Sequence, residues 1–355
     1  VNDSEYMRRA LSLAAQGVGL TSPNPPVGAV IVRNGRQIGS GWHRGSGHPH
    51  AEIEALEDLR SRHGDDAARG ATIYITLEPC STHGKTGPCT AALIRAGLGR
   101  GVIGAQDPNP AHSGAAAGIL EAEGIEVLEG IEEASCQLLV RPFAKVQKTG
   151  LPWVIVKSAL SLDGKITREP GEGQWLSGTN SRKDVQMLRA GVDAILSTGK
   201  TVRSDNPRFT VRGDYAKNGK IQPWRVILTS SNFGVPDDAE VLTDPFSERT
   251  LVFKGRRIEC VLRELVSDYG VVSLMVEAGG GLVGQLLDEG WADEVVLYLA
   301  PLLTGGPVPA SGGEGATDLN QRIRLSESRF RRIDNDVRLR AVLRGAGESP
   351  GPEAD

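Results

Sequence analysis

Residues 78–89 read EPCSTHGKTGPC, and positions 50–52 read HAE. A catalytic zinc ion is held by three protein ligands and keeps its fourth position for water. His50, Cys80 and Cys89 would supply one imidazole and two thiolates, ligands that suit this borderline-soft metal. The metal lowers the pKa of its bound water to about 7, and Glu52 is placed to move a proton between that water and a leaving amine. The two stretches predict a zinc-dependent hydrolase.

The spacing of these residues fits zinc deaminases, which carry H-x-E followed by P-C-x-x-C. Here eight residues rather than two separate the cysteines, and the glycines and proline between them permit a tight loop of that length. The alternative is a closed structural site in which His83 or His48 is the fourth ligand. Glu52 favours the deaminase, because a structural site has no use for an acid at that position.

The composition predicts a soluble, cytoplasmic enzyme with two domains. The chain has 355 residues, of which 39% are hydrophobic and 24% charged, and a domain takes roughly 100–200 residues. A net charge of −4 offers no basic surface for nucleic acid or for an anionic membrane, and neither a membrane span nor a signal peptide is indicated. Four cysteines cannot form a disulfide framework. Cys136 and Cys260 have no cysteine or histidine nearby in sequence and are interpreted as buried thiols.

Hydrophobic patterning in residues 1–145 predicts one α/β unit. The expected strands lie at 27–32, around 38, and at 71–77, 101–105 and 125–128. The expected helices lie at 2–17, 50–62, 90–96 and 118–122. Short apolar strands separated by helices indicate a parallel or mixed sheet that is covered on both faces. Polar residues, glycine and proline at 145–152 then predict a boundary.

A second α/β unit is predicted for residues 146–344. Its expected strands lie at 153–158, 194–197, 225–229, 250–253, 271–276 and 294–299, and its helices at 181–190 and 282–287. Residues 279–284 read GGGLVG, which fits G-x-G-x-x-G between a strand and a helix, a pattern that lets the backbone approach a phosphate. No further βαβ unit with a ribose-binding acid follows, so a tight turn is the alternative. The acidic, glycine-rich tail at 345–355 predicts disorder.

Further motifs make the chain resemble the bifunctional deaminase/reductases of riboflavin biosynthesis. In the first half these are NPPVGAV at 24–30 and DPNP at 107–110, and the long cysteine loop is the ordinary form in that family. The similar residues of the second half are Lys157, 161–165, 174–175, 182–184, 188–189, 201–202, 205–207, 210–212, 277–280, 293–294 and 300–301.

The resemblance implies a cytidine-deaminase-like three-layer αβα domain at 1–145 and a dihydrofolate-reductase-like α/β domain at 146–344. It implies that the first domain hydrolyses the 2-amino group of 2,5-diamino-6-ribosylamino-4(3H)-pyrimidinone 5′-phosphate. The second would use NADPH to reduce the ribosyl group of 5-amino-6-(5-phosphoribosylamino)uracil to a ribityl chain. The implied partners are this small phosphorylated pyrimidine and further copies of the same chain, because the family is oligomeric.

Roles for individual residues also follow from the resemblance. The zinc ligands are His50, Cys80 and Cys89, and Glu52 carries protons. Contacts to the deaminase substrate fall to Asn24, Lys85, Asp107 and Asn109. NADPH would be bound by Trp175, Thr201, Asp205, Ser230, Gly279, Gly280 and Gly281. The reductase substrate would be bound by Arg189, Phe209, Arg212 and Glu277. Guanidinium groups suit a ribose phosphate, although a helix-face Arg189 and a core Trp175 are the simpler interpretations.

The chain departs from the family pattern at two places. Lys200 stands where a small residue is common, and it either contacts the 2′-phosphate of the cofactor or is solvated. Residues 114–118 read GAAAG where the family often has Gly-x-Gly. Two other functions stay open: a deaminase whose second domain is degenerate or reassigned, and a nucleotide-sensing binding module with structural zinc. Glu52 speaks against the binding module.

Overall fold

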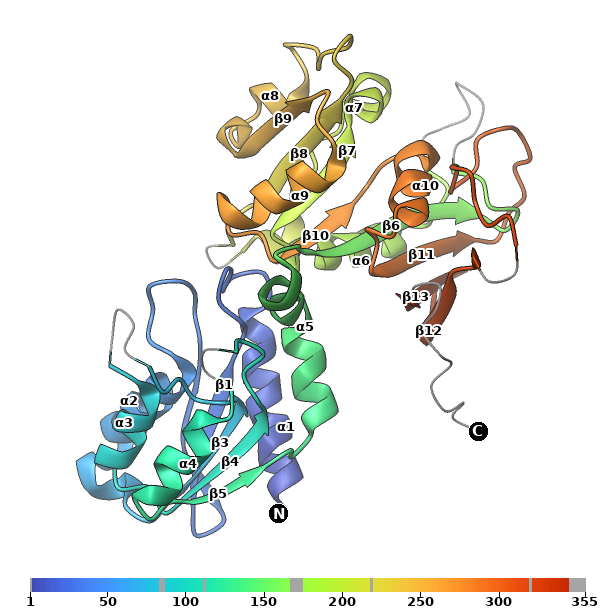
Figure 1. Ribbon diagram of the computed structural model, residues 1–355. Helices are drawn as coiled ribbons and strands as arrows, with labels where there is room; N and C mark the ends of the chain where they lie inside the picture. Colours follow the sequence, from blue (N-terminus) through green and yellow to red (C-terminus); the bar gives the residue numbers. More distant parts are fainter. Residues whose placement is uncertain are drawn as a thin grey trace. The chain divides into compact units, whose positions relative to one another are not determined.

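The computed structural model describes residues 2–82, 87–110, 113–166, 175–217, 220–318 and 321–344. The chain divides into two compact units, residues 1–151 and 152–355, each with its own sheet (Figure 1). His83, Lys85 and the tail at 345–355 lie outside the described residues. Among the helices that are described, none has the length and apolar character that a membrane span requires.

The first unit is built on a five-stranded sheet with the order β2-β1-β3-β4-β5. The strands are β1 (Gly28–Arg33), β2 (Arg36–Trp42), β3 (Thr72–Leu77), β4 (Arg100–Ala105) and β5 (Glu126–Glu129). Strand β1 pairs antiparallel with β2 and with β3, whereas β3, β4 and β5 run parallel. The prediction of a parallel or mixed sheet is therefore confirmed, and the sheet is mixed.

Helices cover both faces of this sheet (Figure 1). The helices are α1 (Asp3–Ala14), α2 (Ala51–His63), α3 (Cys89–Arg95), α4 (Ala115–Ala122) and α5 (Glu133–Thr149), with short 3-10 turns at Ala15–Gly17 and Asp65–Ala68. Neighbouring residues of β1 enter different cores, because side chains alternate along a strand. Val30 packs with α1 and α5, and Ile31 packs with α2, α3 and α4. The predicted three-layer αβα arrangement is present.

The predicted boundary at 145–152 is mostly helical. Helix α5 continues to Thr149 and ends where Gly150 adopts φ 67° and donates its N–H to the carbonyl of Val146. Glycine in this left-handed conformation is the usual end of a helix. The polar side chains that precede Gly150 belong to the last turns of this helix. A linker is similarly polar in composition, which is why the sequence predicts a boundary there. The division between the two compact units falls after this cap in the sequence, between residues 151 and 152.

The second unit is built on an eight-stranded sheet with the order β12-β13-β11-β6-β10-β7-β8-β9. The strands are β6 (Trp153–Ser161), β7 (Ala194–Thr198), β8 (Trp224–Thr229), β9 (Thr250–Lys254), β10 (Ser273–Val276), β11 (Glu294–Ala300), β12 (Arg324–Ile333) and β13 (Asp336–Arg344). The strands from β11 to β9 in this order are parallel, and β13 and β12 complete the sheet as antiparallel strands. The predicted strands are found, and β12 and β13 were not predicted.

The helices of this unit are α6 (Thr179–Ala190), α7 (Gly199–Asp205), α8 (Glu240–Thr243), α9 (Ile258–Ser267) and α10 (Gly280–Asp288), with 3-10 turns at Gly213–Ala216 and Ser247–Arg249. Because β10, β7 and β8 are parallel neighbours, the segments that follow them meet at one edge of the sheet, where ligands bind in such folds.

The two remaining thiols differ in burial. Cys136 of α5 is fully buried, as predicted, whereas Cys260 is exposed. The prediction for Cys260 is wrong because α9 is amphipathic. Ile258, Val261 and Leu262 occupy its buried face, and Cys260 lies on the opposite one.

Candidate active sites

His50, Cys80 and Cys89 come together in the first unit. The Nδ1 atom of His50 lies 3.3 Å from the sulfur of Cys89 and 3.7 Å from that of Cys80, and the three ligand atoms all lie within 4.8 Å of one another. Tetrahedral zinc, with bonds of about 2.0 Å to nitrogen and 2.3 Å to sulfur, places neighbouring ligand atoms roughly 3.5–3.8 Å apart. The three side chains therefore fit one zinc ion.

Local structure explains this convergence. His50 is the N-cap of α2, Cys80 follows β3, and Cys89 is the first residue of α3. The N–H of Cys89 donates to the sulfur of Cys80 over 3.3 Å. The hydrogen bond with Cys89 lowers the pKa of Cys80 to about 4 against the opposing effect of burial, and the shared proton raises the pKa of Cys89. A thiolate is the form that binds metal.

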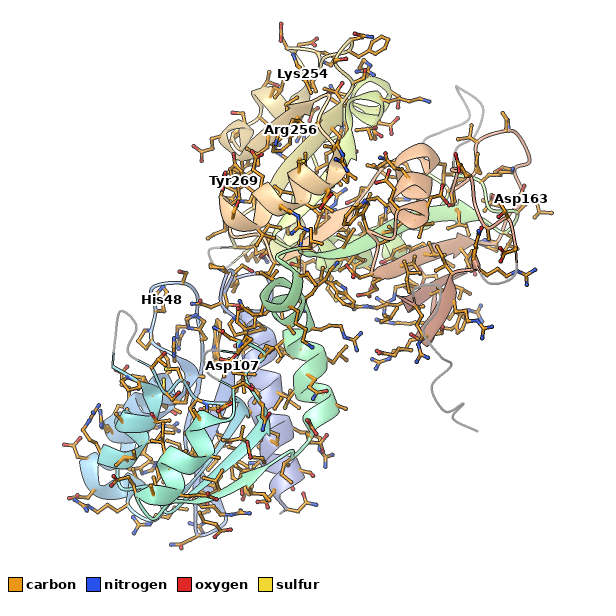
Figure 2. All side chains as sticks on the ribbon, viewed as in Figure 1. His48, Asp107, Asp163, Lys254, Arg256 and Tyr269 are labelled. Atoms are coloured by element: carbon orange, nitrogen blue, oxygen red, sulfur yellow. The ribbon has the colours of Figure 1, made fainter. Side chains whose placement is uncertain are left out.

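Glu52 lies in the first turn of α2, beside the cluster. Its side chain is buried, and burial raises the pKa of this carboxyl. The nearby charge of His50 and the thiol of Cys89 oppose this rise in pKa. A buried acid with a raised pKa, next to a metal site, is suited to accept and return a proton. His48, the alternative fourth ligand, is exposed on the loop before α2 and does not belong to the cluster (Figure 2).

Asn24 is held by a buried histidine that the sequence motifs did not include. The Nδ1 atom of His43 lies 3.0 Å from the carbonyl oxygen of Pro49, which can only accept, so Nδ1 carries a proton. Burial lowers the pKa of His43 and favours the neutral ring. Its Nε2 atom then accepts from the Asn24 amide nitrogen at 3.2 Å. This pair turns the amide oxygen of Asn24 away from His43.

Three of the four predicted substrate residues, Asn24, Asp107 and Asn109, lie at the same edge of the sheet as the predicted metal ligands. Asp107 and Asn109 follow β4, the parallel neighbour of β3, and the Asp107 carboxylate accepts the N–H of Asn109 at 2.8 Å (Figure 2). Asn24 precedes β1, whose first residue donates its N–H to the hydroxyl of Thr76 near the end of β3. Lys85 lies outside the described residues.

A buried ion cluster forms in the second unit. Glu277, directly after β10, accepts two hydrogen bonds from the guanidinium of Arg189 at 2.7 and 3.0 Å, and one from Lys157 of β6 at 3.4 Å. Burial alone would raise the pKa of Glu277, but the charges of Arg189 and Lys157 hold it at about 2. The side chains of Arg189 and Glu277 are each 10% exposed, so Arg189 is not a solvated helix-face residue.

Phe209 and Arg212 are placed beside this cluster. The guanidinium carbon of Arg189 lies 6.0 Å from the centre of the Phe209 ring. Phe209 is buried and has a left-handed backbone with φ 50°. Burial lowers the pKa of Arg212, and the nearby charge of Arg189 adds to that effect. The four predicted residues of the reductase substrate site are therefore close together, and the two arginines form a positive region.

Most of the predicted cofactor residues follow neighbouring parallel strands. Thr201 lies in the first turn of α7, after β7, where its hydroxyl is 3.0 Å from that of Thr198. Ser230 follows β8 and is exposed, and Gly279, after β10, is the N-cap of α10. Asp205 ends α7 and, like Lys200, is exposed.

The glycines at 279–284 have two different surroundings. A Cβ atom on Gly280 would lie 2.3 Å from the carbonyl oxygen of Pro309, and one on Gly284 would lie 2.2 Å from the backbone of Gly312. Gly279 and Gly281 face open space. Gly280 and Gly281 belong to the first turn of α10, so the segment is not a simple tight turn.

Trp175 is not a core residue. Its side chain is 63% exposed, and the guanidinium of Arg182 lies 5.2 Å from its ring centre. The core interpretation is therefore wrong, and the ring is accessible to a planar ligand.

Comparison with known proteins covers both units. Residues 152–339 match the family described as the RibD C-terminal domain. Residues 1–105 match the cytidine and deoxycytidylate deaminase zinc-binding region. The riboflavin biosynthesis protein RibD of Escherichia coli (strain K12) is 39% identical over 332 residues, which cover 86% of this chain and 89% of that protein.

Solved structures are similar over nearly the whole chain. Acinetobacter baumannii RibD, form 1, is 35% identical with a TM-score of 0.87, and the match covers 96% of this chain and 99% of that one. A diaminohydroxyphosphoribosylaminopyrimidine deaminase/5-amino-6-(5-phosphoribosylamino)uracil reductase from Thermotoga maritima is 33% identical with a TM-score of 0.86, covering 96% and 98%.

These similarities confirm the predicted fold classes of both domains and support two activities rather than a deaminase alone. The deaminase half is a hydrolase and the reductase half an oxidoreductase. The chain therefore belongs to the RibD family of riboflavin biosynthesis, in which a deaminase and a reductase are joined in one polypeptide.

Proposed function

We propose that the first unit removes the 2-amino group of 2,5-diamino-6-ribosylamino-4(3H)-pyrimidinone 5′-phosphate, and that the second reduces the ribosyl group of the product with NADPH. The convergence of His50, Cys80 and Cys89 beside the buried Glu52 is the observation that carries this proposal. The enzyme works in the cytoplasm, because two free cysteine ligands need a reducing compartment.

In the deaminase half, His50, Cys80 and Cys89 would hold Zn²⁺, and the bound metal would make water reactive at neutral pH by lowering its pKa. Glu52 accepts a proton from the attacking water and delivers it to the leaving amine. The amide of Asn24, oriented by His43, contacts the pyrimidine. Asp107 and Asn109 contact it from the segment after β4, and Lys85 meets the substrate phosphate.

In the reductase half, Arg189 and Arg212 bind the phosphate of the substrate. Arg189 gives three hydrogen bonds to Glu277 and Thr210. Within the described part of the chain, two of its five N–H groups therefore remain available to bind a ligand. Thr201, Ser230 and the segment 279–281 would bind NADPH at the edge formed by β7, β8 and β10. Trp175 would contact it through its ring, and Asp205 would accept a hydrogen bond from it. NADPH would supply the hydride, and the protein would orient the reactants and exclude water.

The test is incubation of the purified protein with the diaminopyrimidine substrate, with and without NADPH, followed by mass spectrometry. Without NADPH we expect only the deaminated product, in which oxygen replaces the amino nitrogen. With NADPH we expect a second product that carries two further hydrogens. Deamination without any oxidation of NADPH would leave the deaminase-only function as the correct one.

We expect Asp205→Ala to weaken NADPH binding by about 10- to 100-fold, since a hydrogen bond to a charged acceptor contributes about 1.5–3 kcal/mol. Fluorescence titration with NADPH measures the effect. Deamination by the same variant stays at the wild-type rate. Asp214→Ala is the matched control, because Asp214 is an exposed acid of the same unit that pairs with Lys217. Equal NADPH affinity in both variants would remove Asp205 from the cofactor site.

We also propose that the protein is a homo-oligomer formed through β12. This strand ends the sheet order and is exposed along most of its length, and Phe330 on it is 69% exposed. Within the described residues, β12 has a neighbouring strand on one side only, and the outer edge of such a strand can pair with another strand, so two copies of β12 can pair antiparallel about a two-fold axis.

Phe330→Glu is expected to convert the oligomer to a monomer in sedimentation velocity, because it places a charge in the centre of that contact. Ile221→Glu, which changes an exposed apolar residue elsewhere in the unit, leaves the sedimentation coefficient unchanged. A wild-type protein that sediments as a monomer contradicts the proposal.

A further inference from the structure

Glu78 is a buried acid that begins the sequence stretch 78–89 but has no role in the proposed mechanism. Its side chain follows β3 and is 5% exposed. One carboxylate oxygen accepts the backbone N–H of Asp107 at 3.1 Å and that of Gly114 at 2.9 Å, and the other accepts that of Ala116 at 3.0 Å. Asp107 and Gly114 belong to the segment that joins β4 to α4, and Ala116 is the second residue of α4.

Glu78 replaces a missing helix cap. The N-cap of α4 is Gly114, which has φ 77° and no side chain to bind the first free N–H groups of the helix. The carboxylate of Glu78 binds the N–H of Gly114 and that of Ala116, and a negative charge at this end of a helix is favourable.

The same carboxylate also binds the start of the segment. By accepting from Asp107 as well as from Gly114, Glu78 ties both ends of the stretch that carries Asp107 and Asn109. Its own backbone N–H donates to the carbonyl of Ala105 at 2.8 Å, which continues the pairing of β3 with β4. Only Pro79 separates Glu78 from the metal ligand Cys80.

We propose that Glu78 is a positioning residue of the deaminase: it holds the 107–116 segment in fixed register with Cys80 and thereby sets the affinity for the pyrimidine. The inference rests on the proposed contacts of Asp107 and Asn109 with that substrate. A carboxylate is needed because both of its oxygens accept. A glutamine would turn its NH₂ group toward at least one backbone N–H, and neither group can accept.

The experiment compares Glu78→Gln, Glu78→Asp and Glu121→Gln, the last of which changes an exposed glutamate of α4. For Glu78→Gln we expect KM of the diaminopyrimidine to rise about tenfold or more, with a smaller change in kcat and an unchanged zinc content. Glu78→Asp keeps the charge on a shorter side chain and recovers part of the affinity. Glu121→Gln behaves as wild type.

Two further readouts separate positioning from general damage. Hydrogen exchange in peptides covering 106–116 is expected to be faster in Glu78→Gln, because at least one of the three backbone amide protons that Glu78 binds loses its acceptor. Reduction of separately supplied aminouracil substrate stays at the wild-type rate, which shows that the second unit is folded, and the unchanged zinc content shows that the first unit keeps its metal site. Should Glu78→Gln not fold, Glu78→Asp is measured in the same way.

An unchanged KM in both Glu78 variants overturns the inference, as does loss of zinc with kcat reduced and KM constant. Asp107→Ala shows which premise failed. If it raises KM while the Glu78 variants do not, the segment binds substrate but Glu78 does not position it. The other outcome is that Asp107→Ala leaves KM unchanged while hydrogen exchange in residues 106–116 is faster in Glu78→Gln. In that case Glu78 does hold the segment, and the proposed substrate contacts are wrong.

Discussion

Glu52→Ala is expected to lower kcat for deamination by about 10³-fold or more while zinc stays bound, since a positioned acid–base group contributes roughly 10²–10⁴-fold. The metal ligands are the imidazole and the two thiolates, so removing the acid leaves all of them in place. Glu52→Gln keeps the shape of the side chain but cannot carry the proton. The kcat of this variant for deamination is expected to fall by a similar factor. Product formation by mass spectrometry and zinc content by elemental analysis give the two readouts.

The matched control is Glu57→Gln, which changes an exposed glutamate on the same helix. It is expected to deaminate at the wild-type rate. Reduction of added aminouracil substrate is unaffected in all of these variants, because Glu52 belongs to the other unit. Wild-type deamination rates in the Glu52 variants would disprove its role as the proton carrier.

The second large effect is expected from Glu277→Gln. The neutral side chain leaves Arg189 and Lys157 buried without their counter-charge, and breaking a buried ion pair in this way costs about 3–5 kcal/mol. Urea unfolding followed by tryptophan fluorescence measures the free energy of unfolding of the second unit. Reduction is also expected to be lost, because Arg189 no longer has a fixed orientation toward the phosphate.

The same substitution changes how stability depends on pH. The pKa of Glu277 is about 2 in the folded protein, against an ordinary value of 4.5 in the unfolded chain. The contribution of Glu277 to the free energy of unfolding is therefore complete above pH 4.5 and is lost as the pH falls from 4.5 toward 2. Wild-type protein loses stability over this interval more steeply than Glu277→Gln. Glu248→Gln, at an exposed glutamate, serves as the control, and a Glu277→Gln curve identical to the wild type contradicts the argument.

The zinc site could be predicted because its chemistry is local. His50 and Glu52 are two positions apart, and Cys80 and Cys89 flank a single loop. The parallel strands were also predictable, because buried strands form continuous apolar runs. Strand β12 was missed because most of its side chains face solvent, so no alternation marks it.

The contacts of Glu78 and His43 could not be predicted from sequence. Glu78 binds amides as far as Ala116, a separation of 38 positions, and His43 contacts Asn24 across 19. Such pairs depend on how strands are ordered in the sheet, and no local pattern records that order. The signal for Glu78 was a charged residue directly after an apolar strand, where burial requires partners.

The close approach of the 309–312 backbone to α10 affects how variants of the GGGLVG segment are to be interpreted. Gly280→Ala and Gly284→Ala would force backbone atoms apart, whereas Gly281→Ala meets open space. Two of the four glycines in this segment, Gly280 and Gly284, are therefore required by packing, whatever is bound nearby. A related chain that no longer used a cofactor would still need glycine at these two positions to fold. Their presence in another sequence is evidence for this packing, and the residues that reveal cofactor use must be sought at 279 and 281.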